Sequence, residues 1–314
     1  MKLIEASVKG IKNTEDITIK INNSKRLIFL DTSDYKHDNY MKLAKLMHSI
    51  VGVIKGNILA PCEGSEIELN GDFSFSVDIK NHIFKYTCSM SELGSILMET
   101  ICLDGKLCLY TDKVNKFFEY NSDLVKSLED LTRTKINIKQ LKLYTSCLNE
   151  ASIGSILYYG EFFRKIINKF VIIDSIEGIR SIHSSTEFSE KTKKLYEKIM
   201  TQLDLGIDSI KNGRYICNGF PMDIFQMGSG VRVLSTTLPH IIEMILKDNI
   251  CLFYTDGSNC LNTVLTTFLL NNLLRFTRGQ LIMPWFRDIE DFNGLVKDYY
   301  YRLHSNSPES LIIE

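Results

Sequence analysis

The sequence Gln226-Met227-Gly228-Ser229-Gly230-Val231-Arg232 opens the stretch that decides the fold of this chain. Apolar residues follow it at helical spacing, at Leu234, Leu238, Ile241, Ile242 and Ile245. After that helix come an apolar run from Ile250 to Tyr254, an amphipathic segment from Leu261 to Gly279, and a short buried run at 280–283. Residues 220–286 therefore predict helix, buried strand, helix and buried strand, which is the alternation of an α/β domain.

The first part of the chain predicts strands before any long helix. Residues 2–9 and 17–21 alternate between apolar and polar and are expected to form a hairpin, and 27–30 reads as a buried strand. A helix is expected to begin near Asp38. Five further strands are predicted at 66–69, 72–79, 82–88, 96–103 and 106–111, joined by turns at Asn70-Gly71 and Asp104-Gly105.

Aromatic residues alternate along two of these strands, at Phe73, Phe75, Phe84 and Tyr86. Such a row can form a stacking surface for single-stranded nucleic acid. The residues between them are polar, however, so we interpret the aromatic row as the core face of a sheet.

The remaining segments complete the predicted order of elements. Residues 121–168 read as helical, 169–174 as a buried strand, 181–190 as a polar loop and 190–202 as an amphipathic helix. Two alternating segments at 297–304 and 310–313 are expected to be strands that close the sheet of the C-terminal lobe.

In this order of elements the chain resembles ABC-type ATPase heads, in particular the bacterial OLD-like and RloA-like ATPases of the AAA-type, which are relatives of SMC heads. In that family a Ser-x-Gly-Thr signature opens a helix, one strand ends in Asp-Glu, a Ser-Leu-His-Pro loop follows, and the last strand ends in Thr-Thr-His. Here the corresponding residues are Gly228-Ser229-Gly230-Val231, Thr255-Asp256, Cys260-Leu261-Asn262-Thr263 and Pro284-Trp285-Phe286. The phrase Asp204-Leu205-Gly206-Ile207 also recurs in those families.

At the place where the family carries its P-loop, this chain has Asp31-Thr32-Ser33-Asp34-Tyr35-Lys36-His37-Asp38. The loop contains no glycine, whereas a phosphate cradle needs residues that adopt positive φ and let oxygen atoms approach the backbone. Lys36 stands for the P-loop lysine if no residue is inserted, and His37 does so with one insertion; the sequence leaves both alignments open. Asp38 also reads as an ordinary helix N-cap.

The signature-like segment keeps the chemistry of an anion site. Gly228, Ser229 and Gly230 at a helix N-terminus would offer free N–H groups and a hydroxyl, and Arg232 would add a positive charge. In ABC-type dimers this element contacts the γ-phosphate bound to the opposite subunit, so the resemblance implies a contact in trans. The alternative is an ordinary glycine-rich helix start.

The catalytic positions of the family are substituted. Asp256 stands in place of the catalytic glutamate, with Thr255 where the family has a magnesium-orienting aspartate, and Phe286 replaces the γ-phosphate-sensing histidine. We therefore expect no catalytic residues, no metal ligands and no resident cofactor, although the resemblance leaves room for ATP and magnesium.

The resemblance implies a P-loop-NTPase-like ABC ATPase head in three parts. These are an N-terminal β-rich lobe at 1–120, a helical insertion and connecting strand at 121–190, and a C-terminal α/β lobe at 191–314. The function expected is that of a pseudo-ATPase, a scaffold or regulatory subunit that forms a homodimer or a heterodimer with an intact ATPase or nuclease, in bacterial anti-phage defence or DNA transactions. A working ATPase with unorthodox motifs and a nucleic-acid-binding module are the alternatives.

Composition agrees with a globular protein and sets few other limits. The net charge is −1, from 37 basic and 38 acidic residues, which gives no overall attraction to nucleic acid or to an anionic membrane. The eight cysteines are scattered, with no C-x-x-C pair, and resemble reduced intracellular thiols. The sequence shows neither a signal peptide nor an apolar run long enough to span a bilayer, so a cytoplasmic location is expected.

Overall fold

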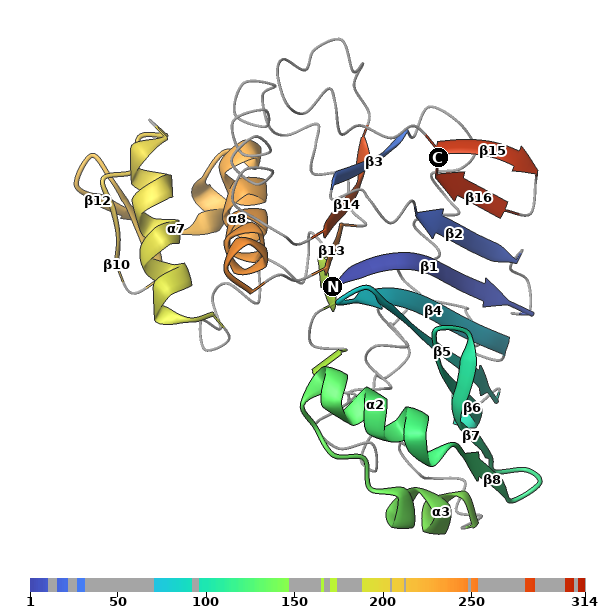
Figure 1. Ribbon diagram of the computed structural model, residues 1–314. Helices are drawn as coiled ribbons and strands as arrows, with labels where there is room; N and C mark the ends of the chain where they lie inside the picture. Colours follow the sequence, from blue (N-terminus) through green and yellow to red (C-terminus); the bar gives the residue numbers. More distant parts are fainter. Residues whose placement is uncertain are drawn as a thin grey trace. The chain divides into compact units, whose positions relative to one another are not determined.

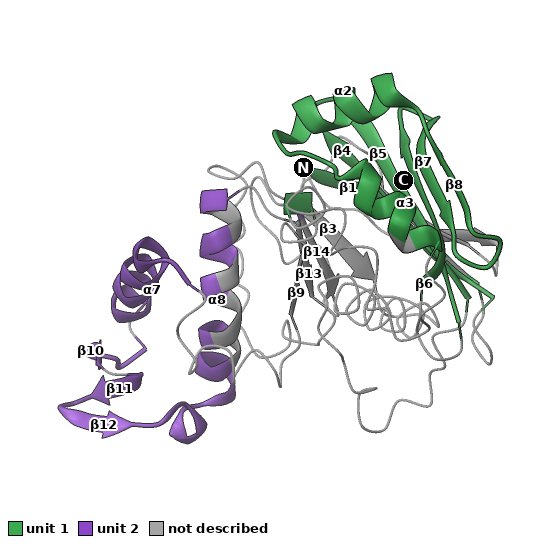
Figure 2. Cartoon of the chain, turned by 90° about the horizontal axis from the view of Figure 1, so that it is seen from below, with its two compact units in different colours: residues 1–25, 38–170, 302–314 green, residues 26–37, 171–301 purple. Residues whose placement is uncertain are grey.

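The computed structural model describes residues 1–10, 16–21, 27–31, 71–91, 96–146, 165–166, 170–173, 188–203, 205–211, 213–247, 250–253, 280–285, 303–307 and 310–313. Figure 1 shows the helices and strands of these residues. The chain divides into two compact units, residues 1–25, 38–170 and 302–314 forming unit 1 and residues 26–37 and 171–301 forming unit 2 (Figure 2). Both units are therefore built from segments that are far apart in the sequence.

Unit 1 is organised on a nine-stranded sheet with the strand order β15-β16-β2-β1-β4-β5-β6-β7-β8. Its strands are β1 (Lys2–Lys9), β2 (Ile17–Ile21), β4 (Gly71–Ile79), β5 (His82–Met90), β6 (Ile96–Leu103), β7 (Lys106–Asp112), β8 (Phe117–Tyr120), β15 (Leu303–Ser307) and β16 (Ser310–Ile313). The β1–β2 hairpin and the antiparallel meander from β4 to β8 form as the alternating sequence predicts. The exception to antiparallel pairing is β16, which runs parallel to β2.

The aromatic row of β4 and β5 forms the core of this unit. Phe73, Phe75, Phe84 and Tyr86 are each at most 2% exposed, and the rings of Phe75 and Tyr86 lie 5.5 Å apart. Cross-strand aromatic pairs of this kind stabilise a sheet through packing. The interpretation of the row as a core face is therefore confirmed.

Two described helices follow the meander. Helix α2 (Ser122–Thr132) begins where Asn121 accepts hydrogen bonds from the N–H groups of Asp123 and Leu124, and it ends at Arg133 in the left-handed conformation. It buries Val125 and Leu128 and packs against β7. Helix α3 (Ile138–Ser146) lies next to β8 and buries Leu141.

The second sheet has four strands in the order β3-β14-β13-β9. They are β3 (Leu27–Asp31), β14 (Gln280–Trp285), β13 (Ile250–Phe253) and β9 (Phe170–Ile173). Strands β3 and β13 both run parallel to β14, with Trp285 level with Asp31 and Leu252 level with Ile282. The short apolar runs of the sequence thus form a parallel sheet, as expected for buried strands without alternation.

The other described residues of unit 2 form a helix pair and a small meander. Helices α7 (Glu190–Gln202) and α8 (Ser229–Lys247) pack together, and strands β10 (Ser209–Lys211), β11 (Arg214–Cys217) and β12 (Phe220–Met222) form the meander, followed by the 3₁₀ helix η1 (Ile224–Gln226). They share one hydrophobic core of Tyr196, Met200, Ile207, Tyr215, Ile224, Leu234, Leu238 and Ile242. The helical periodicity read for residues 190–202 and after Gly230 is confirmed.

Three predictions about the strands are wrong. The last two strands do not close the sheet of the C-terminal lobe, because β16 pairs with β2 in the nine-stranded sheet, and the first of them runs over 303–307 rather than 297–304. Strand β14 extends beyond Met283, so Pro284 and Trp285 lie within it and not in a following loop. Strands β8 and β10 to β12 were not predicted, because runs of three or four residues carry too little periodicity.

Several predicted elements lie outside the described residues. They are the helix after Asp38, the strand at 66–69, the helix from Leu261 to Gly279 and most of the helical region after Ser146. Among the described residues, no helix is long and apolar enough to cross a membrane.

Candidate functional site

The carboxyl ends of β3 and β14 meet at one edge of the parallel sheet. Asp31 closes β3 and is level with Trp285, which closes β14, and β13 runs in the same direction on the other side of β14. In open α/β sheets ligands bind outside the carboxyl ends of the strands, where loops from neighbouring strands converge. The loops that leave β3, β13 and β14 are the ones that carry the predicted site positions.

Most of those positions follow the strands directly in sequence but lie outside the described residues. Lys36, His37 and Asp38 come after β3, Asp256 comes after β13, and Phe286 is the residue after β14. The described strands bring the starting points of these three loops to a common edge. The roles assigned to the five residues stay predictions.

The signature-like residues lie at the start of α8. Ser229 is the first residue of the helix, Gly228 and Ser229 are exposed, and the N–H of Arg232 donates to the carbonyl of Gly228 at 3.1 Å. The N–H groups before Arg232 have no acceptor within the helix, which is the normal condition of a first turn. A Cβ atom added at Gly228 would meet nothing within 4 Å, so packing does not require glycine there.

The 3₁₀ helix η1 leads into α8 and has its own capping box. Asp223 accepts a hydrogen bond from the N–H of Phe225, and the side chain of Gln226 accepts one from the N–H of Asp223 at 2.8 Å. Ile224 in η1 and Leu234 in α8 are both buried in the shared core. The segment that contains Gly228 and Ser229 thus lies between two residues anchored in that core.

A buried carboxylate joins the two helices near the other end of α8. Glu243 Oε1 accepts hydrogen bonds from Thr192 Oγ1 at 2.5 Å and from the N–H of Ser189, the N-cap of α7, while Oε2 contacts the Lys247 ammonium. Burial opposes ionisation, but the contacts with Lys247, Thr192 and Ser189 together lower the pKa of Glu243. Glu243 therefore links α7 to α8 as a charged group.

Two tyrosines also connect α7 to the meander. The phenol oxygens of Tyr196 and Tyr215 are 2.7 Å apart, both side chains are buried, and burial together with Tyr215 raises the pKa of Tyr196. They line a hollow of about 380 Å³ with Thr192, Ile210 and Pro239. The raised pKa keeps the Tyr196 phenol neutral near pH 7, so its hydrogen bond with Tyr215 acts as a structural contact.

Unit 1 contains a buried acid that sequence reasoning missed. Glu99 on β6 is 1% exposed; it accepts a hydrogen bond from Tyr86 at 2.7 Å and a weaker one from Thr111 at 3.5 Å. Burial lowers the pKa of Lys113 to about 8, and Glu99 opposes that shift. A glutamate within the otherwise apolar run of 96–103 was the signal that could have marked this position.

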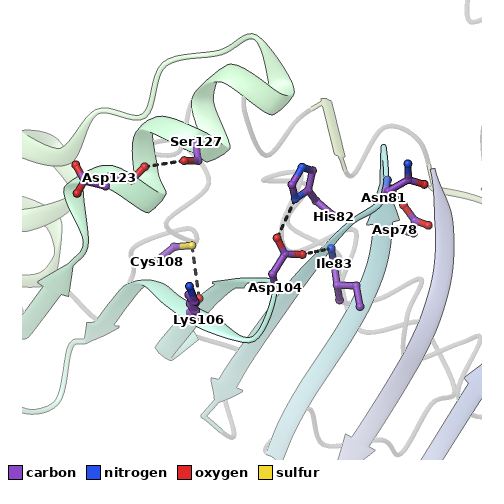
Figure 3. Close-up of polar contacts among 9 residues, drawn as sticks. All are labelled: Asp78, Asn81, His82, Ile83, Asp104, Lys106, Cys108, Asp123 and Ser127. Atoms are coloured by element: carbon purple, nitrogen blue, oxygen red, sulfur yellow. Dashed lines mark hydrogen bonds and ion pairs between the residues drawn. The ribbon is translucent and has the colours of Figure 1, made fainter.

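The other polar contacts of unit 1 close its turns (Figure 3). Asp104 accepts hydrogen bonds from His82 Nδ1 and from the N–H of Ile83, both at 2.8 Å, and these bonds lower its pKa. Burial raises the pKa of the Cys88 thiol, and it raises that of Cys108 to about 11, so neither is an activated nucleophile. Among the residues that the structure describes, no group of three or more His, Cys, Asp or Glu side chains could hold a metal ion.

Of the comparisons with known proteins, only the one with solved structures gives matches, and these concern the fold. No family model matches the chain and no curated protein matches it. Among solved structures it is similar to an SMC head bound to the C-winged helix domain of ScpA, with 10% identity, a TM-score of 0.52 and coverage of 100% of this chain and 98% of that one. It is also similar to the SMC head domain from Thermotoga maritima, with 10% identity, the same coverage and a TM-score of 0.49.

At this identity the similarity concerns the fold alone. The chain has a fold similar to that of an SMC head. The strand order of the parallel sheet and the helix that opens at Ser229 are the parts of that fold on which the predicted site depends.

Proposed function

We propose that this chain is an ABC-type head that does not hydrolyse ATP by itself and serves as a scaffold or regulatory subunit. The observation that carries the proposal is the common edge of β3 and β14, where Asp31 is level with Trp285. In an ABC ATPase this edge presents a glycine-rich cradle and a histidine, whereas here a glycine-free loop with three aspartates and the sequence Pro284-Trp285-Phe286 arrive at it.

The chemistry of these residues does not fit a triphosphate bound in the usual way. Phosphoryl transfer depends on backbone N–H groups, a metal ion and fixed positive charge around the γ-phosphate. Carboxylates beside that group repel it, and a helix N-terminus contributes only about 0.3–1 kcal/mol per charge against such repulsion. Asp256 alone does not replace the Asp-Glu pair of the family.

The start of α8 does fit an anion, because Gly228 and Ser229 are exposed and Gly228 leaves room for close approach. We infer that Gly228, Ser229, Gly230 and Arg232 complete the ATP site of a partner that supplies its own P-loop. The partner would be an intact ATPase subunit or an associated nuclease, in the defence or DNA-transaction setting that the family resemblance implies. One similar structure is an SMC head bound to a domain of another protein, which is consistent with a role in an assembly.

Thermal unfolding with and without ATP and magnesium tests the proposal. A ligand that binds only the native state stabilises it by about 2.7 kcal/mol at a hundredfold excess over its dissociation constant. We expect no shift of the unfolding midpoint for this chain alone, with an intact ABC head measured in parallel as the positive control. A clear shift would contradict the proposal and favour the alternative of a working ATPase.

That alternative makes its own prediction, which is ATP hydrolysis that disappears in the Asp256→Ala variant. Unchanged hydrolysis in the variant would show that the activity arises elsewhere. The other alternative, a nucleic-acid-binding module, requires a face on which Lys and Arg dominate. The exposed charges of the sheet face described below are of both signs, which does not favour it.

A further inference from the structure

One face of the nine-stranded sheet carries a row of four hydroxyl groups across four adjacent strands. Thr18, Ser7, Ser74 and Thr87 are direct partners in the pairing of β2, β1, β4 and β5. Ser7 and Ser74 are buried, and their hydroxyl oxygens are 2.7 Å apart. This row is opposite to the aromatic core face, because side chains alternate along each strand.

Charged residues flank the hydroxyl row on both sides. One flanking row contains Lys20, Glu5, Ser76 and Lys85, which are again direct partners. The other contains Lys9, Asp72 and Ser89, with Asp16 at its end when the register of β1 and β2 is continued by one residue. We call these three rows the polar sheet face; most of its residues line a hollow of about 490 Å³.

Within the unit, the carboxylates of Asp72 and Asp16 accept hydrogen bonds from Ser89 and from the N–H of Gly10, but the facing charges of this face do not pair with one another. Glu5 is directly opposite Lys20, and Lys9 is directly opposite Asp72, yet neither pair forms an ion pair among the described residues. Lys9, Lys20 and Lys85 are exposed. The face therefore presents charges of both signs, in fixed rows, without internal neutralisation.

We propose that the polar sheet face is a docking surface for the same face of a second copy of this chain, with the two-fold axis along the hydroxyl row. Rotation about this axis places each strand over the same strand of the second copy. It also places each flanking row over the other flanking row of the second copy. Lys20 then faces Asp16 of the second copy, and Glu5 faces Lys9 of the second copy. Because a two-fold contact is isologous, each of these oppositely charged pairs occurs twice.

No like charges meet in this arrangement. On β4 Asp72 faces the Ser76 position, and on β5 Lys85 faces the Ser89 position of the second copy. A two-fold axis parallel to the strands would instead bring Lys20 against Lys85, which costs free energy through like-charge contact. The positions of the charges on the four strands thus favour the two-fold axis along the hydroxyl row over the axis parallel to the strands.

The contact is expected to be weak and sensitive to salt. Four strands spaced about 4.8 Å apart and five residues deep give a footprint of a few hundred Å², well below the ~800 Å² per partner of a standard interface. Exposed ion pairs are screened at high ionic strength.

This inference does not rest on the function proposed above. The docking surface lies in unit 1, contains none of the signature-like or P-loop-like residues, and requires no nucleotide. ATP binding by this chain would contradict the proposed function but would say nothing against the docking surface. A chain that stays monomeric would contradict the docking surface but would say nothing against the proposed function.

The experiment is sedimentation equilibrium of the full chain and of two charge-reversal variants, Glu5→Lys and Lys9→Glu. Each variant brings like charges together at both symmetric positions, so we expect the dimer dissociation constant to rise at least about tenfold. An equimolar mixture of the two variants restores opposite charges at both positions and should form a heterodimer. The native chain should dissociate when salt is raised from roughly 50 mM to about 0.5 M.

Lys126→Glu is the matched control, because Lys126 is an exposed lysine on α2 away from this face. It should dimerise like the native chain, and circular dichroism should show all variants folded. A native chain that is monomeric at about 100 µM and low salt would overturn the proposal, since so weak a contact would be worth less than ~5.5 kcal/mol. Variants that dimerise unchanged, or a mixture that stays monomeric, would overturn it as well.

Discussion

At the scale of single residues, a substitution at Gly228 can test the proposed anion site with little effect on folding. The space around the missing Cβ of Gly228 is open, so packing gives no reason for glycine at this position. We expect Gly228→Ala to lower the free energy of unfolding by only about 0.5–1 kcal/mol, because the carbonyl of Gly228 accepts the first hydrogen bond of α8 and glycine is a better N-cap than alanine. Leu234→Ala, in the buried core of the same helix, should cost about 2–5 kcal/mol.

Urea denaturation of both variants measures this difference. If Gly228→Ala were as damaging as Leu234→Ala, the glycine would be needed by the fold and the anion-site interpretation would lose its support. In an ATPase assay with an intact partner, Gly228→Asp should reduce stimulation, because it adds a negative charge where phosphate would approach.

Asp104 gives a prediction about pH. The hydrogen bonds from His82 and Ile83 hold its pKa below the usual value, so the folded state binds the proton less tightly than the unfolded state. The resulting stabilisation is present above the unfolded pKa of about 3.9 and is lost as the pH falls through the folded pKa. Asp104→Asn should therefore cost up to about 1 kcal/mol at pH 7 and progressively less below about pH 4.

The measurement is chemical denaturation of the native chain and of Asp104→Asn at pH 7 and at a pH below about 4. Asparagine suits position 104 because the residue has φ of 51°, a left-handed conformation that asparagine adopts readily. Asp130→Asn, at an exposed position on α2, serves as the control and should show no such pH dependence of the stability difference.

At the scale of elements, the N-cap of α2 is a local determinant of stability. Asn121 accepts two hydrogen bonds of 3.1 Å, from the N–H groups of Asp123 and Leu124. We expect Asn121→Ala to lower the free energy of unfolding by about 1 kcal/mol and Asn121→Asp to be nearly neutral, because aspartate caps equally well. Equal losses in both variants, measured by urea denaturation, would mean that a contact other than the cap is responsible.

The elements also show how far the sequence determines the structure. The bounds of α7 follow from its amphipathic spacing and from Ser189, which caps it, and the strands of unit 1 follow from strict alternation. The β10–β12 meander was missed because its strands have three or four residues, joined at glycines with positive φ such as Gly213 and Gly219. The buried run predicted at 280–283 is part of a longer strand, because β14 continues through Pro284 to Trp285.

For the candidate site, the sequence predicted the helix start near Ser229 but not the polar contacts around α8. The capping box of Asp223 and Gln226 is set by local backbone geometry, and the contacts of the buried Glu243 join residues that are distant in sequence. Such contacts leave no periodic pattern in the sequence. The binding and catalytic roles of Lys36, His37, Asp38 and Asp256 stay predictions.

At the scale of the whole molecule, unit 1 depends on both ends of the chain. Strand β16 runs parallel to β2 and, with β15, forms one edge of the nine-stranded sheet. Deleting residues 302–314 should therefore expose the backbone of β2 and reduce hydrogen-exchange protection in β1 and β2. Protection in α7 and α8 should be unchanged, because the strands of the deleted segment pair within unit 1. Full protection of β2 in the truncated chain would contradict this dependence.

The pairing of β16 with β2 also has a consequence for synthesis on the ribosome. About 290 residues separate the two strands, so at roughly 5–20 residues per second β16 is synthesised some 15–60 s after β2. During that time the nascent chain presents an open strand edge to other proteins. The nine-stranded sheet can be completed only after residues 310–313 have been synthesised, so the edge of β2 stays open while unit 2 is being made.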